Sequence, residues 1–154
     1  MKLSTRSRYG LRLMTTLACG NGVKPVLLKD IAASEELSEK YLSLIVIPLR
    51  AAGLIKSLRG ARGGYNLAKD PNEISLRNII EALEGEICLV HCIKQPSSCN
   101  RSAICPTRDV WNILGNKISE TLNSITLAEL VQIKKEKLAK DKHIHKTGET
   151  FVWK

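Results

Sequence analysis

The chain has 154 residues, of which 44% are apolar, and carries a formal net charge of +9. This length suits one domain with an appendage, and the apolar content is sufficient for a packed core. No apolar run approaches the roughly 18 residues that a membrane span requires. The basic start, Met1 to Arg8, is not followed by an uninterrupted apolar stretch, so we expect no signal peptide, no membrane association and a cytoplasmic location.

The positive charge is concentrated at the two ends of the chain. Residues 1–70 contain 12 Lys and Arg against 5 Asp and Glu, residues 71–130 contain 5 against 7, and residues 131–154 contain 7 against 3. A basic N-terminal half is typical of a module that binds a polyanion such as double-stranded DNA. A solvated lysine-rich surface would explain the charge equally well, so the assignment depends on motifs.

Three helices are predicted at the start of the chain. Apolar residues at helical spacing indicate helices over residues 4–19, 28–33 and 39–52, and Ser38 is the expected cap of the third. A tight turn joins the second and third helices, which is typical of a helix-turn-helix. Pro48 cannot donate a hydrogen bond to the carbonyl of Leu44, so we expect a kink or a separate turn there.

A β-hairpin is predicted next. Residues 54–58 and 65–67 have the character of strands, and the glycine-rich loop between them carries Arg59 and Arg62. Glycines allow close approach to a DNA backbone, and arginine fits a narrow minor groove. The loop matches neither phosphate-binding pattern and leads into a strand, which argues against a nucleotide site. The hairpin is therefore predicted to be a DNA-binding wing.

A short helix starting at Ser75 and a long helix over residues 106–125 are predicted to follow. The long helix repeats apolar residues every three or four positions: Trp111, Leu114, Ile118, Leu122 and Ile125. So long a stripe exceeds what a small N-terminal core covers, and we expect it to pair two subunits in a homodimer.

The predicted fold is mainly α with a small β-hairpin wing. Residues 1–84 form the winged helix-turn-helix domain and residues 85–105 a cysteine-rich loop. Residues 106–131 form the dimerisation helix, and residues 132–154 a flexible basic tail.

Four of the five cysteines fall in the loop, at Cys88, Cys92, Cys99 and Cys105. Cytosolic thiols stay reduced, so clustered cysteines favour a metal or redox site over disulfides. The four thiols also allow two other interpretations of the loop: a zinc site formed by all of them, and a reduced loop that binds no metal. No nucleophile, base and orienting group occur together, so we do not expect an enzyme.

The order of these parts resembles the IscR/NsrR/CymR-type family of bacterial winged helix-turn-helix transcription regulators. The resemblance covers about residues 1–131 and is carried by four stretches: 3–10, 38–42, 49–65 and 125–130. It implies a dimer joined along the long helices, with each third helix in a major groove of the operator and each wing in a minor groove. By position, the base readers are Ser38, Lys40, Tyr41 and Leu44, with Arg59 in the minor groove. Leu44 departs from the polar residue usual there and is limited to a thymine methyl contact or inward packing.

The cysteine spacing is close to that of the cluster-binding, IscR-like members. The resemblance implies that Cys92, Cys99 and Cys105 hold an iron–sulfur cluster, with 2Fe-2S favoured over 4Fe-4S. The two positions that supply a fourth ligand in the family are Arg8 and Arg108 here, which leaves Cys88 or His91 as local candidates, or an exchangeable small molecule.

The sequence thus predicts a dimeric regulator whose DNA binding is controlled by a cluster that reports iron, redox or nitric oxide status. Residues 48–54 instead resemble members that sense cysteine metabolism through a partner enzyme. A cluster-free regulator of that kind and a zinc-stabilised DNA-binding protein therefore stay open as alternatives.

Overall fold

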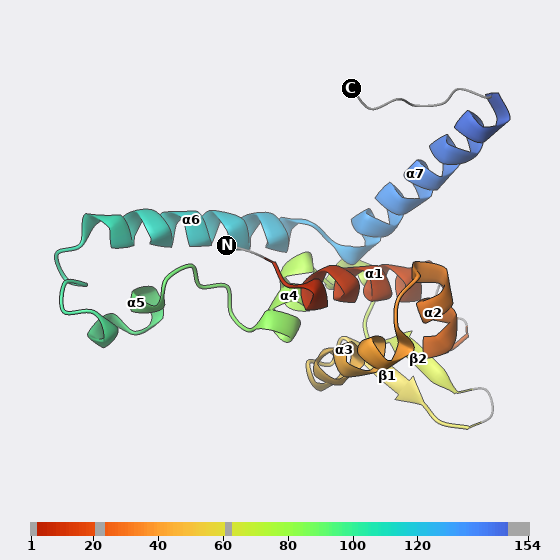
Figure 1. The fold of residues 1–154 in the computed structure, drawn as a ribbon, viewed down its shortest axis with the longest axis horizontal. Helices are drawn as coiled ribbons and strands as arrows, with labels where there is room; N and C mark the ends of the chain where they lie inside the picture. Colours follow the sequence, from red (N-terminus) through yellow and green to blue (C-terminus); the bar gives the residue numbers. More distant parts are fainter. Residues whose placement is uncertain (1–2, 21–23, 61–62, 148–154) are drawn as a thin grey trace.

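The computed structural model describes residues 3–20, 24–60 and 63–147. Its helices and strands follow one another along the chain as Figure 1 shows: α1 (Thr5–Cys19), α2 (Leu28–Glu35), α3 (Glu39–Ala51), β1 (Ile55–Leu58), β2 (Gly64–Leu67), α4 (Leu76–Glu84), α5 (His91–Lys94), α6 (Pro106–Ser124) and α7 (Leu127–Thr147). Two short 3-10 turns, Pro71–Glu73 and Pro96–Ser98, complete the secondary structure of this part. The architecture is mainly α with a two-stranded wing, as predicted.

Helix α1 is the centre of the core. Its residues Leu13 and Met14 are completely buried, and the helix packs against α3, α4 and α7. Ser4 caps its N-terminus by accepting a hydrogen bond from the backbone N–H of Ser7. The hydroxyl of Ser7 in turn donates to Glu84 Oε1 at 2.5 Å, which ties the start of α1 to the end of α4.

The helix-turn-helix forms as predicted, with a left-handed residue at its turn. Glu36 has a φ of 53° and separates α2 from Ser38, whose side chain caps α3. Helix α3 continues through Pro48 to Ala51 as one helix, so no separate turn forms there.

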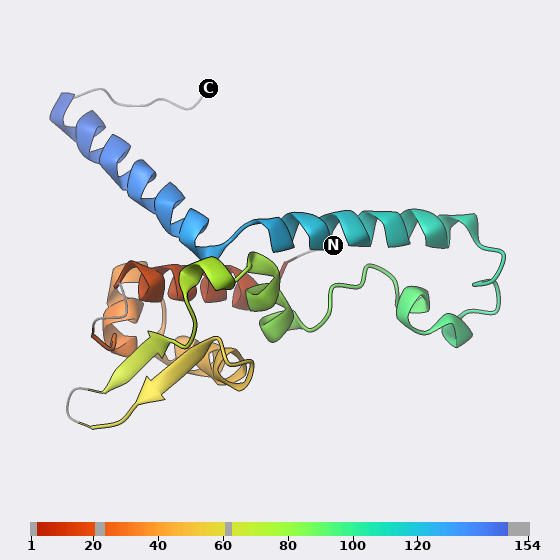
Figure 2. The same ribbon diagram turned by 180° about the vertical axis from the view of Figure 1, so that it is seen from behind.

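The wing is an antiparallel hairpin anchored to the segment before α2. Ile55 pairs with Leu67 and Leu58 pairs with Gly64, and Val26 and Tyr65 exchange two backbone hydrogen bonds of 2.9 Å. A Cβ atom at Gly64 would lie 2.7 Å from the carbonyl oxygen of Val26, so this close approach requires glycine. The hairpin and α3 lie at one side of the molecule, and α6 and α7 lie at the other (Figures 1 and 2).

Residues 85–126, which we call the arm, extend away from the core. Figure 2 shows α6 running outward and the segment that contains α5 running alongside it. No residue of the arm is buried, although Leu122 and Ile125 at its end pack against the core. At its outer part Val110, Trp111, Ile113 and Leu114 are 41 to 63% exposed.

The arm returns to the core through a short hydrogen-bonded connection. The backbone N–H of Leu76 donates to the carbonyl of Ile125 at 2.9 Å, and the N–H of Leu127 donates to the carbonyl of Ile74 at 2.8 Å. These bonds flank an isolated bridge between Ser75 and Thr126. The predicted continuous helix over residues 106–131 is therefore interrupted here.

The expected flexible tail from residue 132 is wrong as far as Thr147, because α7 is one helix from Leu127 to Thr147. Thr126 and Glu129 exchange side-chain to backbone hydrogen bonds of 2.7 and 3.2 Å at its start, which form a capping box. Leu127 and Val131 are buried in the core and fix the first turns of the helix. Residues 148–154 lie outside the described part. Among the helices that are described, none is long and apolar enough to cross a membrane.

Candidate DNA interface and cysteine loop

Helix α3 presents the predicted base readers at its N-terminal half. Ser38, Lys40 and Leu44 are exposed, whereas Tyr41 is half-buried. The Tyr41 ring packs edge-on against Tyr9, with ring centroids 5.8 Å apart. Its hydroxyl lies 3.4 Å from Thr5 Oγ1, so Tyr41 is held against α1 with its polar end at the surface.

Leu44 does not pack inward, because it is 55% exposed. Ile47, one turn further along the same helix, is 56% exposed and was not singled out from the sequence. Both residues fall outside the buried stripe of α3. An apolar residue outside that stripe is the sequence signal that could have identified Ile47. The surface of α3 is thus apolar at its centre and polar at its start.

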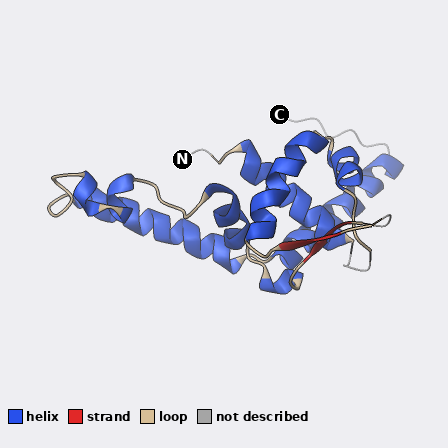
Figure 3. Ribbon diagram, turned by 90° about the horizontal axis from the view of Figure 1, so that it is seen from below, coloured by secondary structure: helices blue, strands red, loops and turns tan. Residues whose placement is uncertain are grey.

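Figure 3 shows the two strands of the wing in red. Arg59 directly follows β1 and is exposed. Gly60 follows with a φ of 108°, a conformation that favours glycine. Arg62, the second predicted wing arginine, lies outside the described residues. The cationic Arg59 and the polar start of α3 are therefore both exposed on the same side of the molecule.

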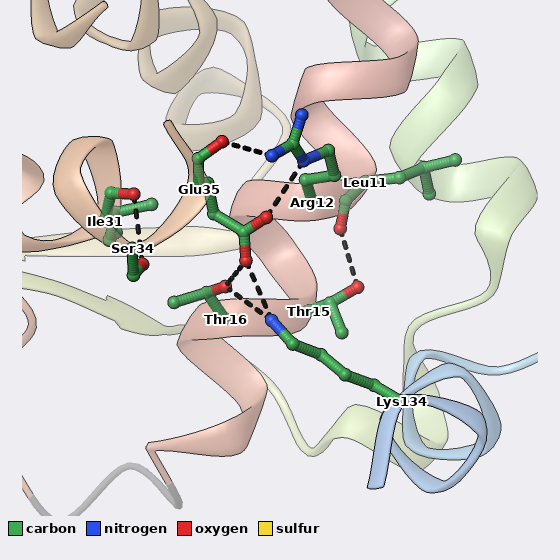
Figure 4. Close-up of polar contacts among 8 residues, drawn as sticks. All are labelled: Leu11, Arg12, Thr15, Thr16, Ile31, Ser34, Glu35 and Lys134. Atoms are coloured by element: carbon green, nitrogen blue, oxygen red, sulfur yellow. Dashed lines mark hydrogen bonds and ion pairs between the residues drawn. The ribbon is translucent and has the colours of Figure 1, made fainter. Parts of the chain in front are cut away.

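A cluster of four residues joins α1, α2 and α7 beside the helix-turn-helix (Figure 4). We call it the Glu35 cluster: Arg12, Thr16, Glu35 and Lys134. The Glu35 carboxylate accepts hydrogen bonds from Arg12 Nε at 2.9 Å, Thr16 Oγ1 at 2.5 Å and Lys134 Nζ at 2.8 Å. Arg12 also donates to the backbone carbonyl of Glu35. Because Glu35 immediately precedes the left-handed Glu36, the cluster fixes the turn that leads into α3.

The environment of Glu35 favours its charged form. Burial raises the pKa of this carboxyl, but hydrogen bonds from Lys134, Thr16 and Arg12 outweigh that effect and hold the pKa below its ordinary value. The carboxylate is therefore ionised at neutral pH.

The cysteine loop has few contacts that hold it in place. Lys94 forms an ion pair with Glu86 at 2.8 Å, and Arg108 Nε donates to the carbonyl of Cys92 at 3.1 Å. The second contact links α5 to the first turn of α6. It also gives Arg108 a structural role in the arm.

The predicted ligands are distributed along this loop. Cys92 lies in α5 and is half-buried, Cys99 follows a 3-10 turn and is exposed, and Cys105 directly precedes α6. All three are free thiols. Within the described residues, no three His, Cys, Asp or Glu side chains lie close enough together to share a metal ion.

The two candidate fourth ligands have local hydrogen-bond partners. Cys88 Sγ donates to the carbonyl of Val90 at 3.1 Å, and His91 Nε2 lies 3.1 Å from Gln95 Oε1. The pKa of the Cys105 thiol is lowered, chiefly by its hydrogen bond with Thr107 and also through the backbone of Arg108. A lowered pKa favours the thiolate, which is the form that binds metals.

An exposed recognition helix beside an arginine-bearing hairpin defines a winged helix-turn-helix protein of the DNA-binding class. The Rrf2 family model, described as an iron-dependent transcriptional regulator, matches residues 3–133. The chain belongs to this family. It is a DNA-binding transcription regulator and not an enzyme, as predicted.

Relatives with different names are similarly close. The chain is 42% identical to the regulator CymR of Bacillus subtilis over 84% of this chain and 89% of the relative. It is 40% identical to protein rrf2 of Nitratidesulfovibrio vulgaris over 86% and 88% of the two chains. It is 35% identical to the regulator IscR of Vibrio campbellii over 86% and 78%.

Solved structures of both CymR and IscR also match this chain. The structure of CymR, the global cysteine regulator of B. subtilis, matches with a TM-score of 0.73 at 41% identity, and the match covers 86% of this chain and 98% of that one. The structure of T. potens IscR matches with a TM-score of 0.72 at 40% identity and covers 88% and 90%. The shared fold is therefore that of both kinds of regulator.

Glu35→Gln should destabilise the protein by about 1 kcal/mol at pH 7, because the amide keeps the size but not the charge. The folded-state pKa of Glu35 is depressed, so its stabilising contribution is complete above the ordinary value of 4.5 and is lost as the pH falls through the folded-state pKa. Urea unfolding at pH 7 and at more acidic pH should show the difference from wild type shrinking on acidification. Glu36→Gln at the exposed neighbouring position is the control, and an equal effect there would contradict this role.

Proposed function

We propose that two copies of this chain pair along α6 and bind an operator through two winged helix-turn-helix domains, and that a cluster on the cysteine loop controls this binding. The proposal has three parts: the DNA contacts, the dimer and the cluster. The observation that carries it is that the arm, which contains no buried residue, bears both the exposed apolar face of α6 and the three spaced thiols.

For the DNA contacts, the start of α3 supplies the readers of the major groove. Ser38 and Lys40 are exposed there and have hydrogen-bonding or charged groups for base edges and phosphates. Leu44, being 55% exposed, is available to contact a thymine methyl group. Arg59 is exposed on the wing, and a guanidinium there suits the electronegative minor groove. Arg62 is proposed to act beside it.

For the dimer, the exposed face of α6 supplies the contact. Trp111 is 41% and Leu114 is 43% exposed, and they lie one turn apart beside Val110. A contiguous apolar face of this kind on a helix that leaves the core indicates a protein partner. A second α6 offers the same apolar face, so a symmetric pair would cover both copies.

For the cluster, Cys92, Cys99 and Cys105 provide three thiolates, which are the usual ligands of iron–sulfur clusters. The described conformation keeps these thiols apart, and its contacts include the Lys94–Glu86 ion pair and the hydrogen bond from Arg108 to Cys92. Binding of a cluster would therefore require the loop to rearrange so that the three thiols meet. Cys88 or His91 would supply the fourth ligand, or a small molecule would, and a 2Fe-2S cluster is favoured.

Control would follow from the position of the loop. Cys105 directly precedes α6, and the α5 segment contacts α6 through Arg108. A cluster that orders this segment would favour one placement of α6 and hence of the two DNA-binding domains. Its effect on DNA binding can be no larger than its preference for that placement. Iron, redox state or nitric oxide would be read as loss or change of the cluster.

A second function is favoured by one specific observation. The chain is 42% identical to CymR of B. subtilis, and a solved CymR structure is titled the global cysteine regulator. A cluster-free regulator controlled by an enzyme of cysteine metabolism is therefore the alternative. A zinc-stabilised DNA-binding protein is the other alternative that the four loop cysteines support.

Arg59→Ala should weaken binding to a duplex selected from genomic DNA by about tenfold, because a wing contact is removed. The slope of log affinity against log salt should fall by about one. Electrophoretic mobility shift or fluorescence anisotropy at several salt concentrations measures both quantities. Lys117→Ala removes an equal charge from α6 and should leave affinity unchanged. Equal affinity of the Arg59→Ala variant and wild type would show that the wing does not reach DNA.

Leu114→Glu should convert the dimer to a monomer, because it places a carboxylate in the proposed apolar contact. Light scattering coupled to size exclusion measures the mass directly. Asn112→Glu adds the same charge on a polar side of the same helix and should remain dimeric. If Leu114→Glu stayed dimeric, the subunits would have to pair elsewhere.

Purification without oxygen should give a brown protein that contains iron and sulfide, and Cys99→Ala should lose both. Cys19→Ala, which changes a thiol in α1 outside the loop, is the matched control and should retain the cluster. Colourless wild-type protein with stoichiometric zinc would support the zinc alternative, and colourless metal-free dimer the partner-enzyme alternative. Iron content and absorption spectra of Cys88→Ala and His91→Ala then test the fourth ligand.

A further inference from the structure

Helix α3 has an apolar patch, formed by Leu44 and Ile47, in the middle of its exposed face. The two side chains are 55% and 56% exposed, and they border a surface hollow of about 390 Å³. The hollow is lined by aliphatic side chains together with Arg6 and Tyr41. An exposed apolar patch with a polar rim is typical of an interaction site. The core uses other residues of this helix: Leu42, Ile45, Val46 and Leu49.

The patch lies on the same face of α3 as one of the predicted base readers. Successive residues of an α-helix are turned by about 100°, so Lys40, Leu44 and Ile47 point within about 60° of one another. Leu42 and Leu49 point to the opposite side and are completely buried. A duplex that meets Lys40 on this face therefore also meets Leu44 and Ile47.

The polar residue beside the patch has its donor hydrogen engaged. Ser43 shares this face, and its hydroxyl donates to the backbone carbonyl of Lys40 at 2.7 Å. A serine hydroxyl has one donor hydrogen, so Ser43 is left to accept a hydrogen bond from a base edge. The middle of α3 accordingly reads a base mainly through apolar contact.

Positive charge lies around the patch. Arg6 lines the hollow, and Lys40 and Arg50 are exposed towards the two ends of α3. In a DNA duplex the base edges of a groove lie between two rows of phosphates, which basic side chains contact. An apolar centre with a cationic rim therefore suits a duplex better than it suits a basic or uncharged protein surface.

We propose that Ile47 is a second specificity-determining residue of α3 and that, together with Leu44, it contacts the C5 methyl groups of thymines at neighbouring base pairs of the operator. This inference rests on the proposed placement of α3 in a major groove, where the thymine methyl is the apolar group on the base edges. Residues 44 and 47 are about 4.5 Å apart along the helix axis, which is comparable to the base step of about 3.4 Å. Arg6 would bind an adjacent phosphate.

The test uses the full-length protein and an operator selected from random duplexes. Replacing a thymine by deoxyuridine removes the C5 methyl group and keeps the base pair. At two neighbouring base pairs, each replacement should weaken binding about fourfold, because one methyl group loses its apolar contact. Fluorescence anisotropy measures the affinity for each duplex. A selected operator without two neighbouring thymines that respond in this way would overturn the proposal.

Two variants assign the methyl groups to side chains. Ile47→Ala should bind the operator at least fourfold more weakly and should lose the response to deoxyuridine at one of the two positions only. Leu44→Ala should lose the response at the other position. Ile47→Val keeps a branched aliphatic side chain and should keep both responses. An Ile47→Ala protein that kept both responses would show that Ile47 does not contact a thymine.

Two further variants separate this inference from the proposed function. Arg59→Ala should weaken binding but keep both responses, because its contact lies in the minor groove, whereas Lys40→Ala should weaken binding at the major groove. If Lys40→Ala weakened binding and Ile47→Ala changed neither affinity nor responses, the thymine contacts would be wrong and the placement of α3 would stand. If neither variant changed the affinity, α3 would not lie in the groove and both proposals would be overturned.

Discussion

Packing around α1 is the constraint on which the rest of the molecule depends. Leu13 and Met14 are buried where α3, α4 and α7 meet, so the recognition helix and the C-terminal helix are both positioned by the same short segment. The Glu35 cluster adds a polar connection between α1, α2 and α7. Helix α7 and the helix-turn-helix are thus joined by packed and hydrogen-bonded contacts and not by a flexible linker.

The arm differs from the core in its packing. Its residues contribute an apolar face and four thiols but no buried side chain. The DNA-binding unit therefore has its own core, whereas the arm is the least tightly packed part of the described chain up to α7.

The sequence predicted the elements whose periodicity and caps agree, such as the helix that begins after Ser38 and the hairpin whose second strand ends at Leu67. It did not predict α7 beyond residue 131. Lysines occupy much of that stretch, and the helix is fixed at its start by the burial of Leu127 and Val131, which is a tertiary effect. The candidate cysteine site was also predictable only in part. Cysteine spacing identifies donors, whereas the positions of Cys92, Cys99 and Cys105 depend on a loop that has no core to define it.

The connection at residues 125–126 joins the arm to the core at a single point. Two backbone hydrogen bonds, from Leu76 to Ile125 and from Leu127 to Ile74, hold the chain on both sides of this connection. A 19-residue helix is about 28 Å long, so a rotation of about 5° at this point moves its far end by about 2.5 Å. A displacement of that size is close to half a helical turn. The cysteine loop lies at the far end of α6, so a rotation about residues 125–126 would move it further than any part of the arm nearer the core.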